Sequence, residues 1–132
     1  MTLRERQDRF ISDIEIFNNW PDRFNYLIMV GEELPEELPE YLLPHRIEGC
    51  QSKTCFFPKI HDGLLYINAW SNSAVMRGIV VEMIRIFNFT SKEEFLNTKI
   101  DFHIKSGIID NLTPMRKDAI EEMIRRITIL IS

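Results

Sequence analysis

The chain has 132 residues, 45% of them hydrophobic, which fits one domain spanning 1–132 whose core needs neither a disulfide framework nor a structural metal. Its 16 basic and 20 acidic residues give a net charge of −4 without a cluster of cations, so nucleic acid is not an expected partner. No apolar run approaches the length of a bilayer crossing, and the charged start MTLRERQDRF lacks a signal core, so we expect no membrane segment and a cytoplasmic location.

The first third of the chain predicts two helices and a connector. Apolar residues recur at helical spacing over 2–18, which indicates an amphipathic helix that Trp20-Pro21 interrupts. Proline suits a first helical turn, so a second helix is expected over 21–33. The stretch 32–44 holds three of the six prolines and no clean period, which predicts a connector on the surface.

The next segment predicts a small antiparallel sheet. Alternating or aromatic-rich patterns over 46–48, 54–60 and 64–70 indicate three strands, with Asp62-Gly63 as the hairpin turn. Pro58 cannot donate to a strand ladder, so one side of its strand is unpaired there or the strand bulges. Three strands are too few to stand alone, and the expected fold class is therefore α+β, a three-stranded antiparallel sheet covered by helices.

The remaining sequence predicts helices again. Ser71 or Asn72 can cap a helix to about residue 88, and this helix is apolar nearly all round, which places it in the middle of the fold. Short helices are expected from Ser91 to about residue 97 and over 101–106, where Gly107 ends the second. Thr113-Pro114 combines an N-cap with a first-turn proline and predicts a final helix to about residue 130.

The sharpest chemical feature is Cys50, which lies between two predicted strands in the sequence Gly49-Cys50-Gln51-Ser52. A single cysteine is most often an inert buried thiol. In a loop, however, the sulfur is reachable, and nearby Arg46 and Lys53 would favour the thiolate, which is the reactive form. These local features leave both interpretations open.

The surrounding blocks resemble the SufE family over nearly the whole chain. Glu48-Gly49-Cys50-Gln51-Ser52-Lys53 resembles the family's GCQS motif. Three further blocks match in the same order, namely NWPDRFNYLI with GEELP, SAVMRGI in the central helix, and LTPMR at the start of the last helix. A four-residue motif alone would be weak, whereas four blocks with matching spacing are strong.

This resemblance implies a fold, a chemistry and partners. The fold would be that shared with IscU-type iron–sulfur scaffold proteins, without a bound cluster and without a cofactor of its own. In that family the GCQS cysteine, here Cys50, takes sulfur from the persulfide of a SufS-like, pyridoxal-phosphate-dependent cysteine desulfurase. It then hands the sulfur to a SufBCD-like cluster-assembly scaffold. The implied role is a sulfurtransferase-like carrier that stimulates the desulfurase, with Gly49, Gln51 and Ser52 as the binding residues around the cysteine.

Two arginines and a second cysteine keep alternatives open. Arg116 and Arg77 could each stabilise a sulfur anion or bind a carboxylate of the partner, or could be ordinary paired or surface arginines. Cys55 is expected to be a small buried thiol, but it could instead resolve Cys50 as a disulfide in a dithiol oxidoreductase. The chain could also be an adaptor that binds a desulfurase without accepting sulfur. The three histidines are too scattered for a metal motif, so no metal site is expected.

Overall fold

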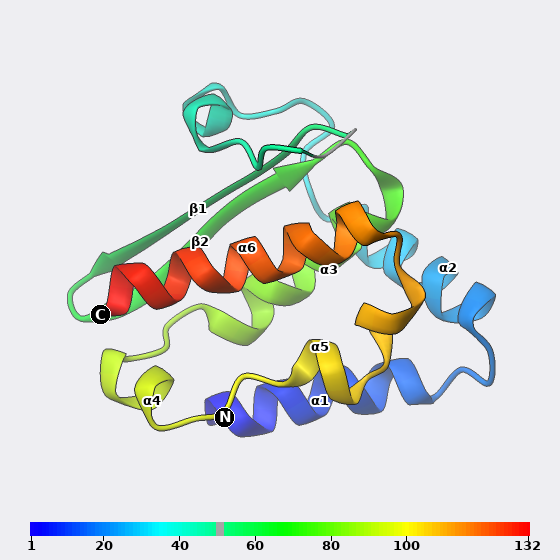
Figure 1. Cartoon of the computed structure of the whole chain (residues 1–132), viewed down its shortest axis with the longest axis horizontal. Coiled ribbons are helices and arrows are strands. Elements are labelled where there is room, and N and C mark those ends of the chain that lie inside the picture. The colour runs from blue at the N-terminus through cyan, green and yellow to red at the C-terminus, as the bar shows by residue number, and fades with distance from the viewer. Residues whose placement is uncertain (50–51) are drawn as a thin grey trace.

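The computed structural model describes residues 1–49 and 52–132, and Figure 1 shows helices packed along one side of a long β-hairpin. The two strands pair in antiparallel order, and α3 lies between β2 and the N-terminal helices α1 and α2, while α6 runs beside β1. The elements, in chain order, are α1 (Leu3–Glu15), α2 (Trp20–Gly31), the 3₁₀ helix η1 (Glu40–His45), β1 (Thr54–His61), β2 (Leu64–Ser71), α3 (Ala74–Phe87), α4 (Lys92–Leu96), α5 (Phe102–Lys105), the 3₁₀ helix η2 (Ile108–Asn111) and α6 (Pro114–Ile131).

The fold class is α+β as expected, but the predicted three-stranded sheet is wrong, because the sheet described has two strands. In the predicted strand 46–48, Arg46 forms a single bridge with Cys55, and the Ile47 N–H donates to the Thr54 carbonyl at 2.8 Å. The 3₁₀ helix η1 ends directly before this bridge, and the chain turns directly after it at Gly49, whose φ is +83°. Too few residues remain between these two features for a strand.

Pro58 lies in an uninterrupted strand register, opposite Ile67, so the alternative of a bulge is wrong. The carbonyls of Thr54 and Phe56 point away from β2, since they accept hydrogen bonds from Ile47 and from Arg126. Pro58 has the same parity along the strand, which puts its missing N–H on the outer edge of β1. The ladder with β2 therefore loses no hydrogen bond at this proline.

The central position predicted for α3 is confirmed, since nine of its 14 residues are buried. Its closest neighbour is α2. A Cβ added at Gly78 would lie 1.9 Å from the Leu27 carbonyl oxygen, and one added at Gly31 would lie 2.7 Å from Cβ of Arg77. These two glycines therefore allow the α2 and α3 backbones to approach each other.

The sequence predicted Ser71 or Asn72 as the N-cap of α3, and this prediction is wrong, because the N-cap is Ser73. Ser71 still belongs to β2, and its hydroxyl accepts a hydrogen bond from the Ser73 N–H at 3.1 Å. The predicted starts of the later helices are confirmed, because Ser91 caps α4 and Thr113 caps α6 with Pro114 as its first residue.

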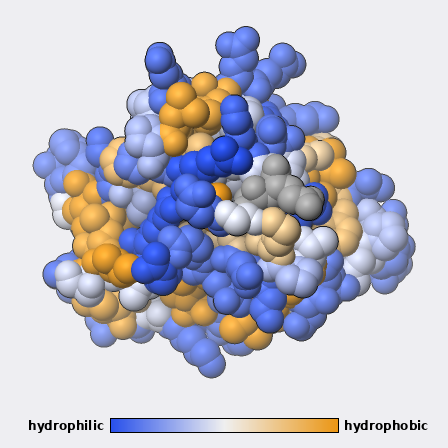
Figure 2. Space-filling view, turned by 45° about the horizontal axis from the view of Figure 1, so that its top comes forward, coloured by the Kyte–Doolittle hydropathy of each residue, from blue (hydrophilic) through white to orange (hydrophobic). Residues whose placement is uncertain are grey.

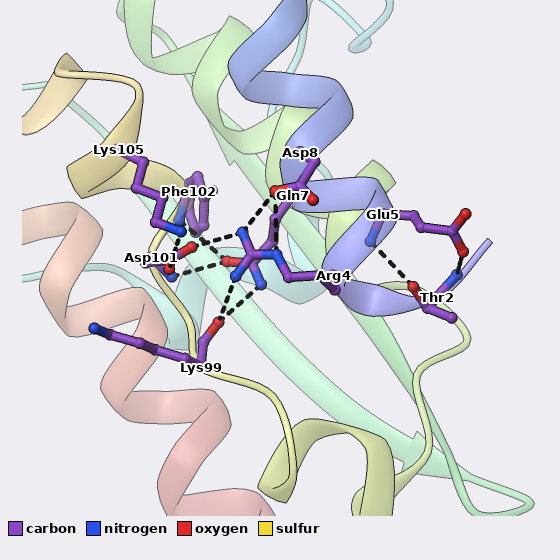
Figure 3. A network of polar contacts seen from close by, with 9 residues as sticks. All are labelled: Thr2, Arg4, Glu5, Gln7, Asp8, Lys99, Asp101, Phe102 and Lys105. Atoms are coloured by element: carbon purple, nitrogen blue, oxygen red, sulfur yellow. Dashed lines mark hydrogen bonds and ion pairs between the residues drawn. The ribbon is translucent and has the colours of Figure 1, made fainter.

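A buried polar network fixes α1 to the segment before α5 (Figure 3). The Gln7 side chain accepts hydrogen bonds from the N–H groups of Asp101 and Phe102, at 2.8 and 3.1 Å, and donates to the Lys99 carbonyl at 3.0 Å. Arg4 donates to the Asp101 carboxylate at 2.7 Å and lowers its pKa against the opposing effect of burial. Gln7 is fully buried, so its amide replaces the water that these three backbone groups would otherwise need.

Two further polar side chains hold the helices in place. Arg126 of α6 donates to the carbonyls of His45 and Phe56 at 2.9 Å, which ties η1 to the sheet edge. Glu82 of α3 is 4% exposed and bonds to Arg85, and burial raises the pKa of its carboxyl.

Candidate functional site

Three segments that are far apart in the sequence meet around one open cavity of about 530 Å³. The first is the loop before β1, the second is the turn from β2 into α3, and the third is the first turn of α6. The lining residues are Ser52, Asn72, Ser73, Ala74, Thr113, Met115 and Arg116. Two helices therefore begin at the wall of the same cavity.

The electrostatics of this cavity favour an anion. The positive ends of the α3 and α6 dipoles lie here, since Ala74 and Pro114 are the first residues of the two helices. The Thr113 hydroxyl caps α6 by accepting from the Arg116 N–H at 3.4 Å, whereas no side chain in the described part of the chain caps α3. The buried Ser73 hydroxyl likewise has no hydrogen-bond partner among the described residues.

Arg116 adds a full positive charge to the cavity wall. Its side chain is half-buried, and its guanidinium makes no hydrogen bond or ion pair with any residue that the structure describes. The cavity thus combines two helix N-termini with a guanidinium, which is the setting that lowers the free energy of a thiolate or of another small anion.

The predicted binding residues fall in different places around this cavity. Ser52 lines it, and the Ser52 hydroxyl lies 3.4 Å from that of Thr54. Gly49 is exposed and has a positive φ of +83° that disfavours any other residue. Cys50 and Gln51 lie outside the described residues.

Comparison with known proteins decides the family. A family model described as SufE, Fe-S metabolism associated domain, matches residues 8–130. The chain is also 30% identical over 127 residues to an uncharacterized SufE-like protein of Rhizobium meliloti (strain 1021), and the match covers 91% of this chain and 90% of that protein. The chain belongs to the SufE family. Its role therefore lies in iron–sulfur metabolism.

In this SufE-family chain Arg77, the other predicted arginine, lies beside the cavity but not in its lining. Its guanidinium donates to the carbonyls of Ser71 at 3.0 Å, Leu34 at 2.7 Å and Pro35 at 3.1 Å. It also lies over the Trp70 ring, 5.7 Å from the ring centre. The contacts described give Arg77 an anchoring role, since they join the connector after α2 to the start of α3.

Cys55 has the environment of a structural thiol. It is 1% exposed on β1 and packs with Leu42 and Trp70 in a small cluster on the face of the hairpin opposite the main core. Burial is the largest influence on this thiol and raises its pKa, against the opposing charges of Arg46 and other cations. A buried thiol with a raised pKa is a poor nucleophile and a poor resolving group.

Sequence reasoning missed Asn72, Ser73 and Met115 as cavity residues. The sequence offers Asn72 as a possible helix cap, and Ser73 and Met115 stand in the SAVMRGI and LTPMR blocks that resemble the family, without a signal that either lines a cavity. Among the described residues no three His, Cys, Asp or Glu side chains are grouped closely enough to hold a metal ion. No helix in the described ranges is both long enough and apolar enough to span a bilayer.

Proposed function

We propose that this SufE-family protein accepts sulfur on Cys50 from the persulfide of a pyridoxal-phosphate cysteine desulfurase. It then passes the sulfur to an iron–sulfur cluster scaffold in the cytoplasm. The observation that supports this best is the cavity, because Ser52, two residues after Cys50 in the sequence, lines it together with the starts of α3 and α6. Three of the four sequence blocks that resemble the family thus contribute to one wall.

The transfer step is a thiol–disulfide type exchange that needs no external oxidant. The Cys50 thiolate attacks the outer sulfur of the desulfurase persulfide and forms a new sulfur–sulfur bond. The original sulfur–sulfur bond breaks, and its electron pair leaves with the desulfurase cysteine as a thiolate. When the outer sulfur carries a proton, the products are a Cys50 persulfide and an enzyme thiolate, so one negative charge stands on each side and the oxidation states balance. The Cys50 persulfide then releases its proton to solvent and becomes the anion.

The cavity supports this exchange because both the attacking group and the product are anions. The N-termini of α3 and α6 supply partial positive charge, and Arg116 supplies a full charge. Their combined effect increases the thiolate fraction of a cysteine at neutral pH, where an unperturbed thiol is only a few per cent ionised.

The experiment that tests the proposal is single-turnover sulfur transfer followed by mass spectrometry. A cysteine desulfurase from the same organism is charged with cysteine and mixed with wild type, Cys50→Ser or Cys55→Ser, and added sulfur is located in peptides. Wild type and Cys55→Ser gain one sulfur atom at Cys50, whereas Cys50→Ser gains none and no longer stimulates the desulfurase. Retained stimulation by Cys50→Ser would identify an adaptor, and loss of transfer in Cys55→Ser would favour a dithiol mechanism.

A second variant tests the role of the cavity wall. Arg116→Gln removes the charge and is expected to slow transfer by about tenfold at pH 7, the effect of one nearby charge in a partly buried setting. The loss should shrink as the pH rises through the thiol pKa, because Cys50 is then ionised without help. Arg125→Gln, an exposed arginine later in α6, is the matched control and should transfer sulfur at the wild-type rate. A loss in Arg116→Gln that does not depend on pH would contradict thiolate stabilisation.

A further inference from the structure

A second hollow, of about 370 Å³, lies next to the cavity between Ser52 and the starts of α3 and α6. Its lining residues are Glu32, Leu34, Glu36, Trp70, Asn72 and Arg77, and we refer to it as the Trp70 groove. Asn72 lines both hollows, so the groove continues directly from the cavity. A partner that covers the cavity with its own reacting cysteine therefore has this groove within its footprint.

The groove combines an apolar base with an anionic rim. Leu34 and Trp70 supply the base, and Glu32 and Glu36 are exposed at its edge. Neither glutamate side chain makes a hydrogen bond or ion pair with another described residue. Arg77 is a lining residue too, and its guanidinium donates to the carbonyls of Leu34, Pro35 and Ser71 but keeps its positive charge. The two glutamates therefore leave the lining with a net charge of −1.

The negative charge of the chain is concentrated in the segment that supplies Glu32 and Glu36 to this rim. Residues 32–40, here called the acidic connector, contain five glutamates and no basic residue. The remaining 15 acidic and 16 basic residues give the rest of the chain a net charge of +1, against −5 for these nine residues. All five glutamates are exposed, and one of them, Glu33, is paired with Arg85.

The acidic connector is also held in place, unlike a freely moving charged loop. The Trp70 indole N–H donates to the Pro35 carbonyl at 2.8 Å, and Arg77 donates to the same carbonyl and to that of Leu34. Leu34 and Leu38 pack against the cluster of Leu42, Cys55 and Trp70. Because the carboxylates start from an anchored backbone, little ordering entropy is lost when a partner binds them.

The face shown in Figure 2 has hydrophobic side chains only in separate patches divided by hydrophilic ones. The lining of the groove itself mixes three charged side chains with Leu34 and Trp70, so an interface that includes it needs polar complementarity as well as apolar contact. The chemistry that fits is a lysine or arginine side chain, whose aliphatic stem packs on Leu34 and Trp70 while its cationic head meets Glu32 and Glu36.

From this geometry we propose that the Trp70 groove docks a basic segment of the cysteine desulfurase and thereby aligns the two reacting sulfurs. The inference rests on the proposed function, since it assigns the desulfurase as the occupant. The groove sets the affinity and the association rate, while Cys50 and the cavity carry out the exchange.

The test measures binding and sulfur transfer in the same mixtures. The full chain and the desulfurase are titrated by fluorescence anisotropy at low and high salt, and transfer is followed by mass spectrometry at saturating desulfurase. Glu32→Gln with Glu36→Gln should weaken binding by about five- to tenfold at low salt, and this difference should largely vanish at high salt. Glu32→Lys with Glu36→Lys should weaken binding further.

The control is the pair Glu93→Gln with Glu121→Gln, exposed carboxylates on α4 and α6 that change the net charge by the same amount. This pair should bind like wild type, and the groove variant should still reach the wild-type extent of transfer when the desulfurase is saturating. Equal affinity of the groove variant and the control would overturn the groove proposal while leaving sulfur transfer intact. Salt-dependent binding without any sulfur on Cys50 would overturn the proposed function and support the groove alone.

Discussion

Because α2 and α3 contact each other at Gly78, an added methyl group at this position should lower the free energy of unfolding strongly. At Gly78→Ala the added carbon would lie 1.9 Å from the Leu27 carbonyl oxygen, whereas ordinary contacts begin at 3.4 Å. The two helices must therefore separate by about 1.5 Å, because the added carbon is fixed to the α3 backbone and the Leu27 atoms that it meets are backbone atoms that cannot rotate away.

The expected magnitude follows from two opposing effects. Alanine improves helix propensity by about 1 kcal/mol, and overpacking against a rigid neighbour costs about 3 kcal/mol or more. The free energy of unfolding should therefore fall by about 2 kcal/mol, which lowers Tm by about 6–10 °C for a chain of this size.

Urea unfolding followed by circular dichroism measures this difference directly. Asn25→Ala, on the exposed side of α2, is the control, and it should leave the midpoint unchanged or raise it slightly. If Gly78→Ala were as stable as wild type, the backbones of α2 and α3 would not approach as closely as described, and the reasoning would fail.

Three other substitutions test the polar contacts that hold the helices. Arg126→Met removes the donors to three backbone carbonyls and should cost about 2–3 kcal/mol in urea unfolding, whereas the exposed Arg125→Met should leave the midpoint unchanged. Burial raises the pKa of the Glu82 carboxyl in the folded protein above its value in the unfolded chain. The contribution of Glu82 to stability is therefore complete below the pKa of the unfolded state, and it is lost as the pH rises through the pKa of the folded state. Glu82→Gln, which keeps an acceptor for its arginine partner, should therefore be more stable than wild type at pH 7 but not at pH 4. Gln7→Ala leaves buried backbone groups beside Asp101 unpaired and should lower stability by about 2–4 kcal/mol, measured by thermal unfolding; a loss below 1 kcal/mol would show that water replaces the amide.

The helices were predictable because their signals are local. Pro21 and Pro114 fix first turns, Ser91 and Thr113 cap, and the structure places the corresponding helices within a few residues of the expected ends. The apolar pattern of α3 also sufficed to place it in the core, because a helix without a polar face has no solvent side.

The prediction of a strand over 46–48 failed because three alternating residues carry little information. Whether Arg46 begins a strand depends on the 3₁₀ helix before it and the turn after it, and η1 contains Pro44 in a stretch without a clean period. Neighbouring backbone geometry, and not the side-chain pattern, decided the outcome.

The site was predictable in part. Ser52 and Arg116 could be nominated from the family resemblance, and the structure brings both to one cavity. The carbonyl partners of Arg77 could not be predicted from the sequence, because Leu34 and Pro35 are more than 40 residues away and contribute only backbone atoms to the contact. Every residue carries a main-chain carbonyl, so the residue type does not indicate which carbonyl accepts a hydrogen bond.

The proline on the outer edge of β1 has a consequence for crowded conditions. A hairpin that exposes an edge offers a template on which a strand from another molecule can add, the first event in many aggregation pathways. At Pro58 the template lacks a donor, and the nearby Phe56 carbonyl is already occupied by Arg126. Pro58 and Arg126 therefore both disfavour the pairing of a strand from another molecule with this edge of β1.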